Sequence, residues 1–185
     1  MDIKGSKVLV TGGAGFIGSF VVAELLKEDV GEVLIYDNLA RGEMSYIKDQ
    51  LKDPRCEFFR GDLRETDLLN AAMAGCDYVI HLAAMWLLHC KNYPRTAFDV
   101  NIQGTFNVLE ACVNNNIKRL VYSSSASVYG SADIMPISEL CHLSTSNPYA
   151  QTKLVIENLL KDVFNSDSDW NISILRYFNP VGAHQ

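Results

Sequence analysis

Residues 8–27 read VLVTGGAGFIGSFVVAELLK, and this stretch decides the fold. Residues 8–10 have the pattern of a buried strand, and residues 16–27 have that of a helix. Gly12, Gly15 and Gly18 between them allow a tight turn and let the backbone approach a ligand closely. The N–H groups and partial positive charge at the start of the helix favour an anion. We therefore expect this unit to hold the pyrophosphate of a dinucleotide; a glycine-rich turn without a binding role is the alternative.

The remainder of the chain alternates between short apolar runs and longer helical patterns. Further strands are predicted at residues 33–36, 57–60, 78–82, 119–123 and 172–177. Helices are predicted at residues 43–52, 65–74, 96–114 and 148–164. Continuous apolar strands separated by helices indicate an α/β protein whose parallel sheet is covered on both faces. The expected architecture is the doubly wound sheet of a Rossmann fold, with strand order 3-2-1-4-5-6 and its ligand beyond the carboxyl ends of the strands.

Two carboxylates follow predicted strands at the edge where the ligand is expected. Asp37 ends the second strand, where it can accept hydrogen bonds from ribose hydroxyls and repel a 2′-phosphate. This position favours NAD over NADP, although the nearby Arg41 could pair with a 2′-phosphate and Asp37 could merely begin a turn. Asp62 follows the third strand, where it suits either the adenine amino group or the cap of the next helix.

A tyrosine and a lysine share one face of the predicted helix at 148–164. Tyr149 and Lys153 are four residues apart, so the lysine ammonium is expected to stabilise the phenolate and lower its pKa. Such a tyrosine can act as a base near neutral pH. Ser123 to Ser125 end the fifth strand, where a hydroxyl can hydrogen-bond a substrate oxygen. A surface Tyr–Lys pair is the alternative, but the glycine turn and the serines together favour catalysis.

The composition excludes several other functions. The formal net charge is −6 without a long basic run, so no nucleic-acid partner is expected. The apolar run from Tyr78 to Leu88 is interrupted by His81 and too short to cross a bilayer. No signal-peptide pattern is seen and the five cysteines are widely spaced, so we expect a cytoplasmic protein without membrane contact. His89 and Cys90 have no second ligand pair at suitable spacing, so we expect no metal site.

Several segments carry a resemblance to a known family. They are TGGAGFIG (11–18), YDN (36–38), GDL (61–63), HLAA (81–84), Asn101, SSSASVYG (123–130), NPYAQTK (147–153) and LRYFNPVGAH (175–184). Together they resemble the extended short-chain dehydrogenase/reductase family and, within it, the nucleotide-sugar epimerases. The last segment is especially similar to the UDP-glucose (UDP-galactose) 4-epimerases.

The resemblance implies a set of site residues. Ser125, Tyr149 and Lys153 would be catalytic, and Ser125, Tyr149 and Asn179 would contact a UDP-sugar substrate. Asn101 would support the catalytic helix, and Tyr177 and Phe178 would flank the nicotinamide. The implied NAD site comprises Gly12, Gly15, Phe16, Ile17, Asp37, Asn38, Asp62, Leu63, Leu82, Ala83, Ala84, Asn101, Ser123, Tyr149, Lys153, Tyr177 and Phe178.

The resemblance also implies a mechanism. Tyr149 would remove the proton of the sugar 4-hydroxyl as hydride passes to NAD. The 4-keto sugar would turn over in the site and receive hydride on its other face, while Tyr149 returns the proton. NAD would stay bound as a resident cofactor.

Three features of the sequence bear on related activities. The UDP-galactose epimerases usually carry a lysine that contacts the cofactor near the position of Trp86. This departure leaves other UDP-sugars open as substrates, such as N-acetylhexosamines or uronic acids. Sugar-nucleotide 4,6-dehydratases carry an acidic Thr-Asp-Glu sequence where residues 125–127 are Ser-Ala-Ser, which argues against that reaction. Asp37 argues against a ketoreductase that uses NADPH.

The resemblance predicts the domain organisation as well. We expect residues 1–180 to form an NAD-binding Rossmann domain with the catalytic residues, and residues 181–185 to begin a truncated substrate-binding region. Because the family places most of its sugar-binding lobe later in the chain, we expect a truncated epimerase that holds NAD but turns over poorly or not at all. A non-catalytic NAD-binding fragment is the alternative. The full-length protein is expected to be a homodimer formed through helices 96–114 and 149–164.

Overall fold

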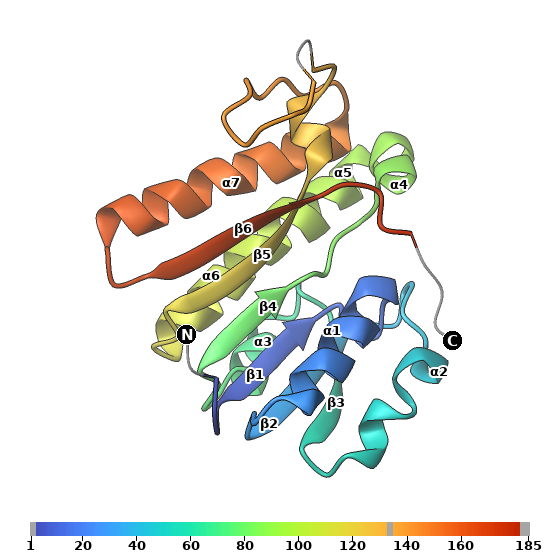
Figure 1. The fold of residues 1–185 in the computed structure, drawn as a ribbon, viewed down its shortest axis with the longest axis vertical. Helices are drawn as coiled ribbons and strands as arrows, with labels where there is room; N and C mark the ends of the chain where they lie inside the picture. Colours follow the sequence, from blue (N-terminus) through green and yellow to red (C-terminus); the bar gives the residue numbers. More distant parts are fainter. Residues whose placement is uncertain (1–2, 133–134, 182–185) are drawn as a thin grey trace.

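A six-stranded parallel sheet forms the centre of the molecule (Figure 1). The structure is a computed structural model that describes residues 3–132 and 135–181. The strand order β3-β2-β1-β4-β5-β6 confirms the predicted doubly wound topology. The strands are β1 (Lys7–Thr11), β2 (Glu32–Asp37), β3 (Cys56–Arg60), β4 (Tyr78–His81), β5 (Arg119–Ser125) and β6 (Asn171–Tyr177).

The register brings the carboxyl ends of the central strands to one edge. Thr11 at the end of β1 lies opposite Tyr36 of β2 on one side and His81 of β4 on the other. Ser125 at the end of β5 pairs with Tyr177 at the end of β6. The segments that follow these strands are therefore neighbours in space, which places the predicted site residues along a single edge.

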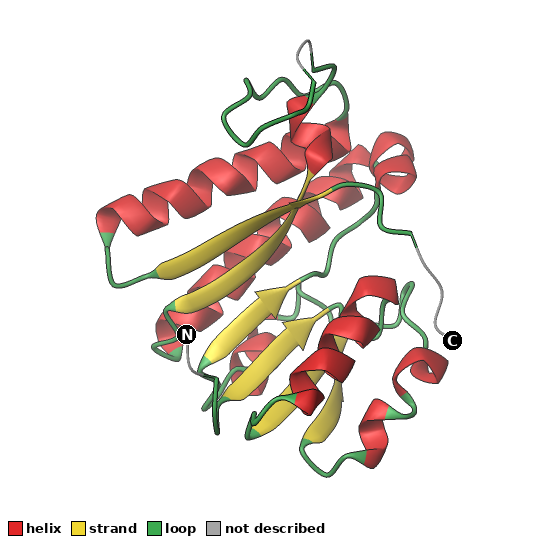
Figure 2. Ribbon diagram, in the orientation of Figure 1, coloured by secondary structure: helices red, strands yellow, loops and turns green. Residues whose placement is uncertain are grey.

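Helices lie on both sides of the sheet (Figures 1 and 2). The α-helices are α1 (Phe16–Lys27), α2 (Met44–Ile47), α3 (Thr66–Ala72), α4 (Leu87–Asn92), α5 (Pro94–Ala97), α6 (Gly104–Asn114) and α7 (Pro148–Ser166). Shorter turns are η1 (Gln50–Lys52), the π-helical η2 (Phe98–Gln103) and η3 (Ala126–Tyr129). Helix α1 lies on one face of the sheet, and α3, α6 and α7 lie on the other.

Successive side chains of each strand point to opposite faces of the sheet, and two apolar cores result. Leu9 and Leu120 point to the face of α3, α6 and α7, where they join the buried Ile156 of α7. Val10 and Ile35 point to the opposite face, where they join Val22 of α1. Burial of each such side chain contributes about 1.5–3 kcal/mol to folding, so the two cores hold both helical layers to the sheet.

Two predicted helices differ from their expectation, and one helix was not predicted. The single helix predicted at 96–114 consists of α5, the π-helical turn η2 and α6, and α4 was not predicted as a helix. Within this region the Thr105 hydroxyl donates to the Asn101 carbonyl at 2.6 Å. An acceptor used by a side chain in this way locally loosens the regular i→i−4 pattern. Likewise, the helix predicted at 43–52 is divided into α2 and η1.

Cover over the sheet is uneven. Helix α1 covers β1 and β2, whereas Figure 1 shows no described helix over the same face of β5 and β6. Leu175 of β6 is 42% exposed there. The expected cover on both faces is thus complete only for part of the sheet. In the described part of the chain, none of the helices is both long and apolar enough to cross a membrane.

Candidate dinucleotide and catalytic site

The glycine turn between β1 and α1 leaves no room for side chains. A Cβ on Gly12, where φ is +71°, would lie 2.8 Å from the backbone nitrogen of Ala83. A Cβ on Gly18 would meet the carbonyl oxygen of Gly12, so this glycine lets the helix pack on the turn. No side chain caps α1 at Gly15, and the first N–H groups of a helix have no intrahelical acceptor. The turn is therefore a cradle that fits an anionic group.

Asp37 organises the loop beside this cradle. Its carboxylate accepts the N–H of Ala14 at 3.1 Å and the N–H of Leu39 at 2.8 Å. Burial raises the pKa of Asp37, and these two N–H groups oppose that effect. Each carboxylate oxygen keeps further acceptor capacity for a ligand hydroxyl.

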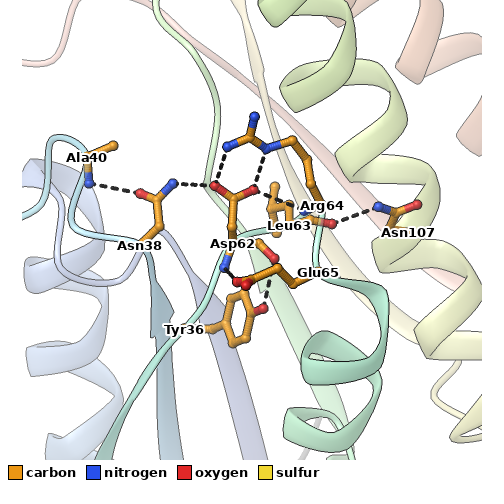
Figure 3. A network of polar contacts seen from close by, with 8 residues as sticks. All are labelled: Tyr36, Asn38, Ala40, Asp62, Leu63, Arg64, Glu65 and Asn107. Carbon is orange, nitrogen blue, oxygen red and sulfur yellow. Dashed lines mark hydrogen bonds and ion pairs between the residues drawn. The ribbon is translucent and has the colours of Figure 1, made fainter.

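Asp62 is the centre of a polar network on the neighbouring wall (Figure 3). Arg64 donates to both carboxylate oxygens at 2.8 Å, and Asn38 donates from its amide at 2.8 Å. Arg64 holds the pKa of Asp62 well below its usual range. Because α3 starts at Thr66 with Glu65 as its N-cap residue, the helix-capping alternative for Asp62 is wrong. The network instead ties the ends of β2 and β3 together.

These walls enclose a cleft of about 590 Å³ at the carboxyl edge of the sheet. Most of the residues predicted for the dinucleotide site line it. They are Gly12, Gly15, Phe16, Ile17, Asp37, Asn38, Asp62, Leu63, Leu82, Ala83, Ala84 and Ser123. The cradle, the carboxylate of Asp37 and a cleft of this size together fit a dinucleotide.

The other predicted site residues lie around or behind this cleft. Tyr177 lines a second, apolar cavity of about 560 Å³ together with Phe16 and Ile17. Phe178 is 62% exposed and Asn179 is exposed beside it. Asn101 is buried behind the wall. Residues 182–185 of the predicted substrate region lie outside the described residues.

The candidate catalytic groups come from β5 and the first turns of α7. Asn147 caps this helix by accepting the N–H of Ala150 at 2.8 Å, and Pro148 occupies its first turn. Lys153, only 3% exposed, donates to the carbonyl of Ser123 at 2.6 Å. Its ammonium lies 5.8 Å from the ring centre of Tyr149. The fold therefore brings the predicted Ser–Tyr–Lys set together.

The protonation behaviour of this set differs from the sequence-based expectation. Burial raises the pKa of Tyr149, and the Ser125 hydroxyl acts in the opposite direction. The expected lowering of the Tyr149 pKa is not found, because desolvation of the phenolate is the dominant effect and the opposing group is Ser125, not Lys153. Burial also lowers the pKa of Lys153, to about 8. The phenol therefore holds its proton at neutral pH unless further positive charge stabilises the phenolate.

A buried histidine connects the glycine turn with the π-helical turn η2. His81 Nδ1 lies 2.7 Å from the Thr11 hydroxyl, and Nε2 lies 2.9 Å from the Thr105 hydroxyl. Because Thr105 donates to the carbonyl of Asn101, it must accept from Nε2–H. Burial lowers the pKa of His81 to about 3, so the ring is neutral.

The same network continues to the catalytic helix. The amide of Asn101 accepts the N–H of Met85 at 2.6 Å and donates to the Thr152 hydroxyl at 3.1 Å. Thr152 in turn donates to the carbonyl of Tyr149 at 2.7 Å. Asn101 therefore contacts α7 one hydrogen bond away from Tyr149, the candidate catalytic residue.

Sequence reasoning missed a buried ion pair behind the catalytic groups. Arg176 of β6 donates to both carboxylate oxygens of Glu157 at 2.9 and 2.7 Å, and Ser124 donates to the same carboxylate at 2.6 Å. Burial opposes ionisation of Glu157, yet the hydrogen bonds from Arg176 and Ser124 lower its pKa overall. Glu157 follows Lys153 by one helical turn, and this spacing was the available signal.

Trp86 and its neighbours form an aromatic cluster on the cleft wall. The Arg41 guanidinium lies 4.8 Å from the centre of the Trp86 ring, and His89 lies 5.3 Å from it. The neighbouring Cys90 points elsewhere, because its sulfur donates to the carbonyl of Met85 at 3.3 Å. Among the described residues, no group of three or more His, Cys, Asp or Glu could hold a metal ion.

Comparison with known proteins shows which family the chain belongs to. The model of the NAD dependent epimerase/dehydratase family matches residues 8–185. The chain belongs to this family. A UDP-glucose 4-epimerase from Dictyostelium discoideum is 39% identical over 189 residues, which cover all of this chain and 55% of that protein. The chain spans about half the length of the curated relatives it matches.

Solved structures of the epimerase/dehydratase family share the fold in detail. The structure of UDP-glucose 4-epimerase from Stenotrophomonas maltophila, with bound NAD and formylated UDP-arabinopyranose, has a TM-score of 0.92 and 38% identity. The match covers 97% of this chain and 55% of that one. The UDP-Glc/GlcNAc 4-epimerase from Campylobacter jejuni has a TM-score of 0.89 and 32% identity, with 94% of this chain and 54% of that one covered.

Proposed function

We propose that this chain binds NAD and carries the acid–base residues of an isomerase that epimerises a UDP-sugar at C4 through a 4-keto intermediate. The observation that carries the proposal is the convergence of Tyr149, Lys153 and Ser125 beside the dinucleotide cleft. Family membership and the fold shared with 4-epimerases that bind NAD and UDP-sugars support it.

We assign a part of the cofactor to each wall of the cleft. The turn at Gly12 and Gly15 would hold the pyrophosphate, and Asp37 would accept from the adenosine ribose. Asp62 and Asn38 would face the adenine side of the cleft. When bound, NAD supplies a positively charged hydride acceptor.

Proton transfer falls to the residues of β5 and α7. Tyr149 would take the proton of the sugar 4-hydroxyl and later return it from the same oxygen. Ser125 would hydrogen-bond the substrate oxygen and stabilise the phenolate, in line with its effect on the pKa of Tyr149. Lys153, held by the carbonyl of Ser123, would place a cation 5.8 Å from the centre of the Tyr149 ring. These groups hold the proton within the site while C4 loses and regains its hydrogen.

The sugar is proposed to be the UDP-glucose/UDP-galactose pair. The similarity to UDP-glucose 4-epimerases supports this choice. Trp86 on the cleft wall, together with the likeness to a UDP-Glc/GlcNAc 4-epimerase, gives UDP-N-acetylhexosamines as the second candidate, followed by uronic acids. Residues 125–127 offer no carboxylate for dehydration.

We also propose how the chain is organised in the assembled protein. Residues 1–180 would form the cofactor-binding and catalytic domain, with a substrate-binding region from residue 181 onward. A homodimer would form through α6 and α7, whose exposed apolar side chains Phe106, Val113 and Phe164 support such a contact.

The test uses the absorbance of NADH. The chain is mixed with NAD and a panel of UDP-sugars, and reduction of the cofactor is followed over time. We expect a small signal with UDP-glucose or UDP-galactose, because the relatives supply about twice this length of chain. Tyr149→Phe should lower the rate of that signal by about 10²–10⁴-fold while NAD still binds. Absence of a signal with every sugar, despite NAD binding, would favour a non-catalytic binding module.

A further inference from the structure

Arg41 spans the mouth of the dinucleotide cleft. It lies in the loop after β2, yet its guanidinium stacks on Trp86, which follows β4, at 4.8 Å from the ring centre. The sheet order places β1 between these two strands. The contact between Arg41 and Trp86 therefore joins segments that follow β2 and β4, on either side of the strand that leads into the glycine turn. Both Arg41 and Trp86 line the cleft.

The loop that carries Arg41 is fixed directly on the glycine turn. Glu43 donates its N–H to the carbonyl of Ala14 at 3.0 Å, and Asp37 accepts the N–H of Ala14 on the other side. A Cβ on Gly42 would lie 2.9 Å from that same carbonyl oxygen, so the loop backbone packs against the turn. Arg41 thus projects from a segment whose distance to the cradle is set by backbone contacts.

The charges on the cleft wall leave Arg41 as the available cation. Arg64 is committed to Asp62 through two hydrogen bonds of 2.8 Å. Among the described residues, the arginines in ion pairs are Arg55, Arg64 and Arg176, and the guanidinium carbon of Arg41 instead lies over the Trp86 ring. Stacking on a ring leaves the N–H edges of a guanidinium free to donate to oxygen anions.

We propose that Arg41, backed by Trp86, binds the diphosphate of the dinucleotide and completes the cradle at Gly12 to Gly15. This inference rests on the proposed function, since it concerns the same cofactor. A diphosphate offers several charged oxygens to the N–H edge of the arginine, and such charge-assisted hydrogen bonds are the strong ones. The carboxylate of Asp37 would repel a 2′-phosphate on the ribose. We therefore assign Arg41 to the diphosphate and not to a 2′-phosphate.

The experiment measures binding by calorimetry for the wild-type chain and four variants. The ligands are ADP, adenosine, NAD and NADP. Arg41→Gln should lower the affinity for ADP and NAD by about tenfold or more, because a charged hydrogen bond is lost. The affinity for adenosine, which has no phosphate, should not change. Trp86→Leu should lower the affinity for ADP a few-fold, and Trp86→Phe should bind ADP with almost the wild-type affinity. Arg119→Gln is the matched control, because Arg119 makes the same kind of stack on Tyr78, at 4.9 Å, away from the cleft.

The outcomes separate the inference from the proposed function. Equal losses of NAD and NADP affinity in Arg41→Gln support the diphosphate role. A larger loss for NADP would overturn it in favour of a 2′-phosphate contact, and so would unchanged ADP affinity. If the wild-type chain binds neither ADP nor NAD, the proposed function fails together with the inference. Wild-type binding with an unaffected Arg41→Gln variant overturns the inference alone.

Discussion

Lys153 carries an ammonium group that is buried at a cost to the stability of the fold. Its ammonium is almost inaccessible, and its strong polar contact is one backbone carbonyl at 2.6 Å. The i, i+4 spacing from Tyr149 was sufficient to predict that the two residues share a face. It could not predict the pKa values, because these depend on desolvation by β5 and on side chains distant in sequence. The raised pKa of Tyr149 is the clearest example.

The titration of Lys153 should appear in the stability of the fold. Its pKa falls from 10.5 in the unfolded chain to about 8 in the folded chain. Between these pH values the unfolded chain binds the additional proton, so the free energy of unfolding rises with pH through that window. The rise amounts to about 3 kcal/mol. Urea unfolding of wild type and Lys153→Met across pH 7.5–10.5 should show curves that diverge, whereas parallel curves would refute the shift.

The buried His81 should make the free energy of unfolding depend on pH in the acid range. Its pKa is lowered from 6.5 to about 3, so neutral His81 contributes stability that is complete above pH 6.5. As the pH falls through 6.5 toward 3, the unfolded chain protonates first and this stability is progressively lost, by about 1.4 kcal/mol per pH unit. His81→Asn, which keeps an acceptor for Thr11, should show a weaker loss between pH 6 and 4. If wild type and His81→Asn lose the same free energy of unfolding between pH 6 and 4, the His81 ring is not held neutral by burial.

Helix α7 and strand β6 are held to each other by the pair of Glu157 and Arg176. The network extends through Ser124 to β5, which also carries Ser125, and Arg176 donates to the Tyr129 hydroxyl at 2.8 Å. Strand order and helix positions followed from hydrophobic periodicity, because each helix must cover apolar strands. The break at η2 did not, since it depends on hydrogen bonds between Thr105, His81 and Asn101 that only the folded chain assembles.

Removal of one member of the ion pair should destabilise the fold. Glu157→Gln leaves the Arg176 charge without its partner and should cost about 3–5 kcal/mol, measured by urea unfolding. The double variant Glu157→Leu, Arg176→Met should be more stable than either single variant, because no unpaired charge remains. Lys161→Ala, whose exposed amine lies 4.0 Å from Glu157, is the control and should change stability by less than about 1 kcal/mol. Additive single effects would show that the pair is not coupled.

The assembled sheet joins two unlike regions along its carboxyl edge. One is the cleft over β1, β2 and β4, whose wall carries the carboxylates of Asp37 and Asp62, and the other is the apolar cavity between α1 and the end of β6, lined by Phe20, Val21 and Tyr177. Most of the residues predicted for the dinucleotide site line the first region, because its motifs are local turns after strands, whereas lining residues such as Tyr46 and Val100 lie outside those motifs. The second arises from segments far apart in sequence, and its apolar surface agrees with the greater length of the relatives.

The preference for NAD over NADP should be measurable as a difference in how much each cofactor stabilises the fold. A ligand at a hundred times its dissociation constant raises the free energy of unfolding by about 2.7 kcal/mol. NAD should therefore raise the melting temperature, and NADP at the same concentration should raise it less, because Asp37 opposes a 2′-phosphate. Asp37→Asn should reduce the difference between the two. Equal stabilisation of the wild-type chain by both cofactors would contradict the role given to Asp37.

The most direct measurement is an NMR titration of the isotopically labelled chain with NAD, followed through its backbone amides. We predict saturable shifts at Gly12 to Ile17, at residues 37–41 and at Ser123 to Ser125, with little change along the amino ends of the strands. This pattern would place the cofactor across the glycine turn and against the catalytic strand. An absence of saturable shifts, or shifts confined to surfaces away from the carboxyl edge, would contradict the account.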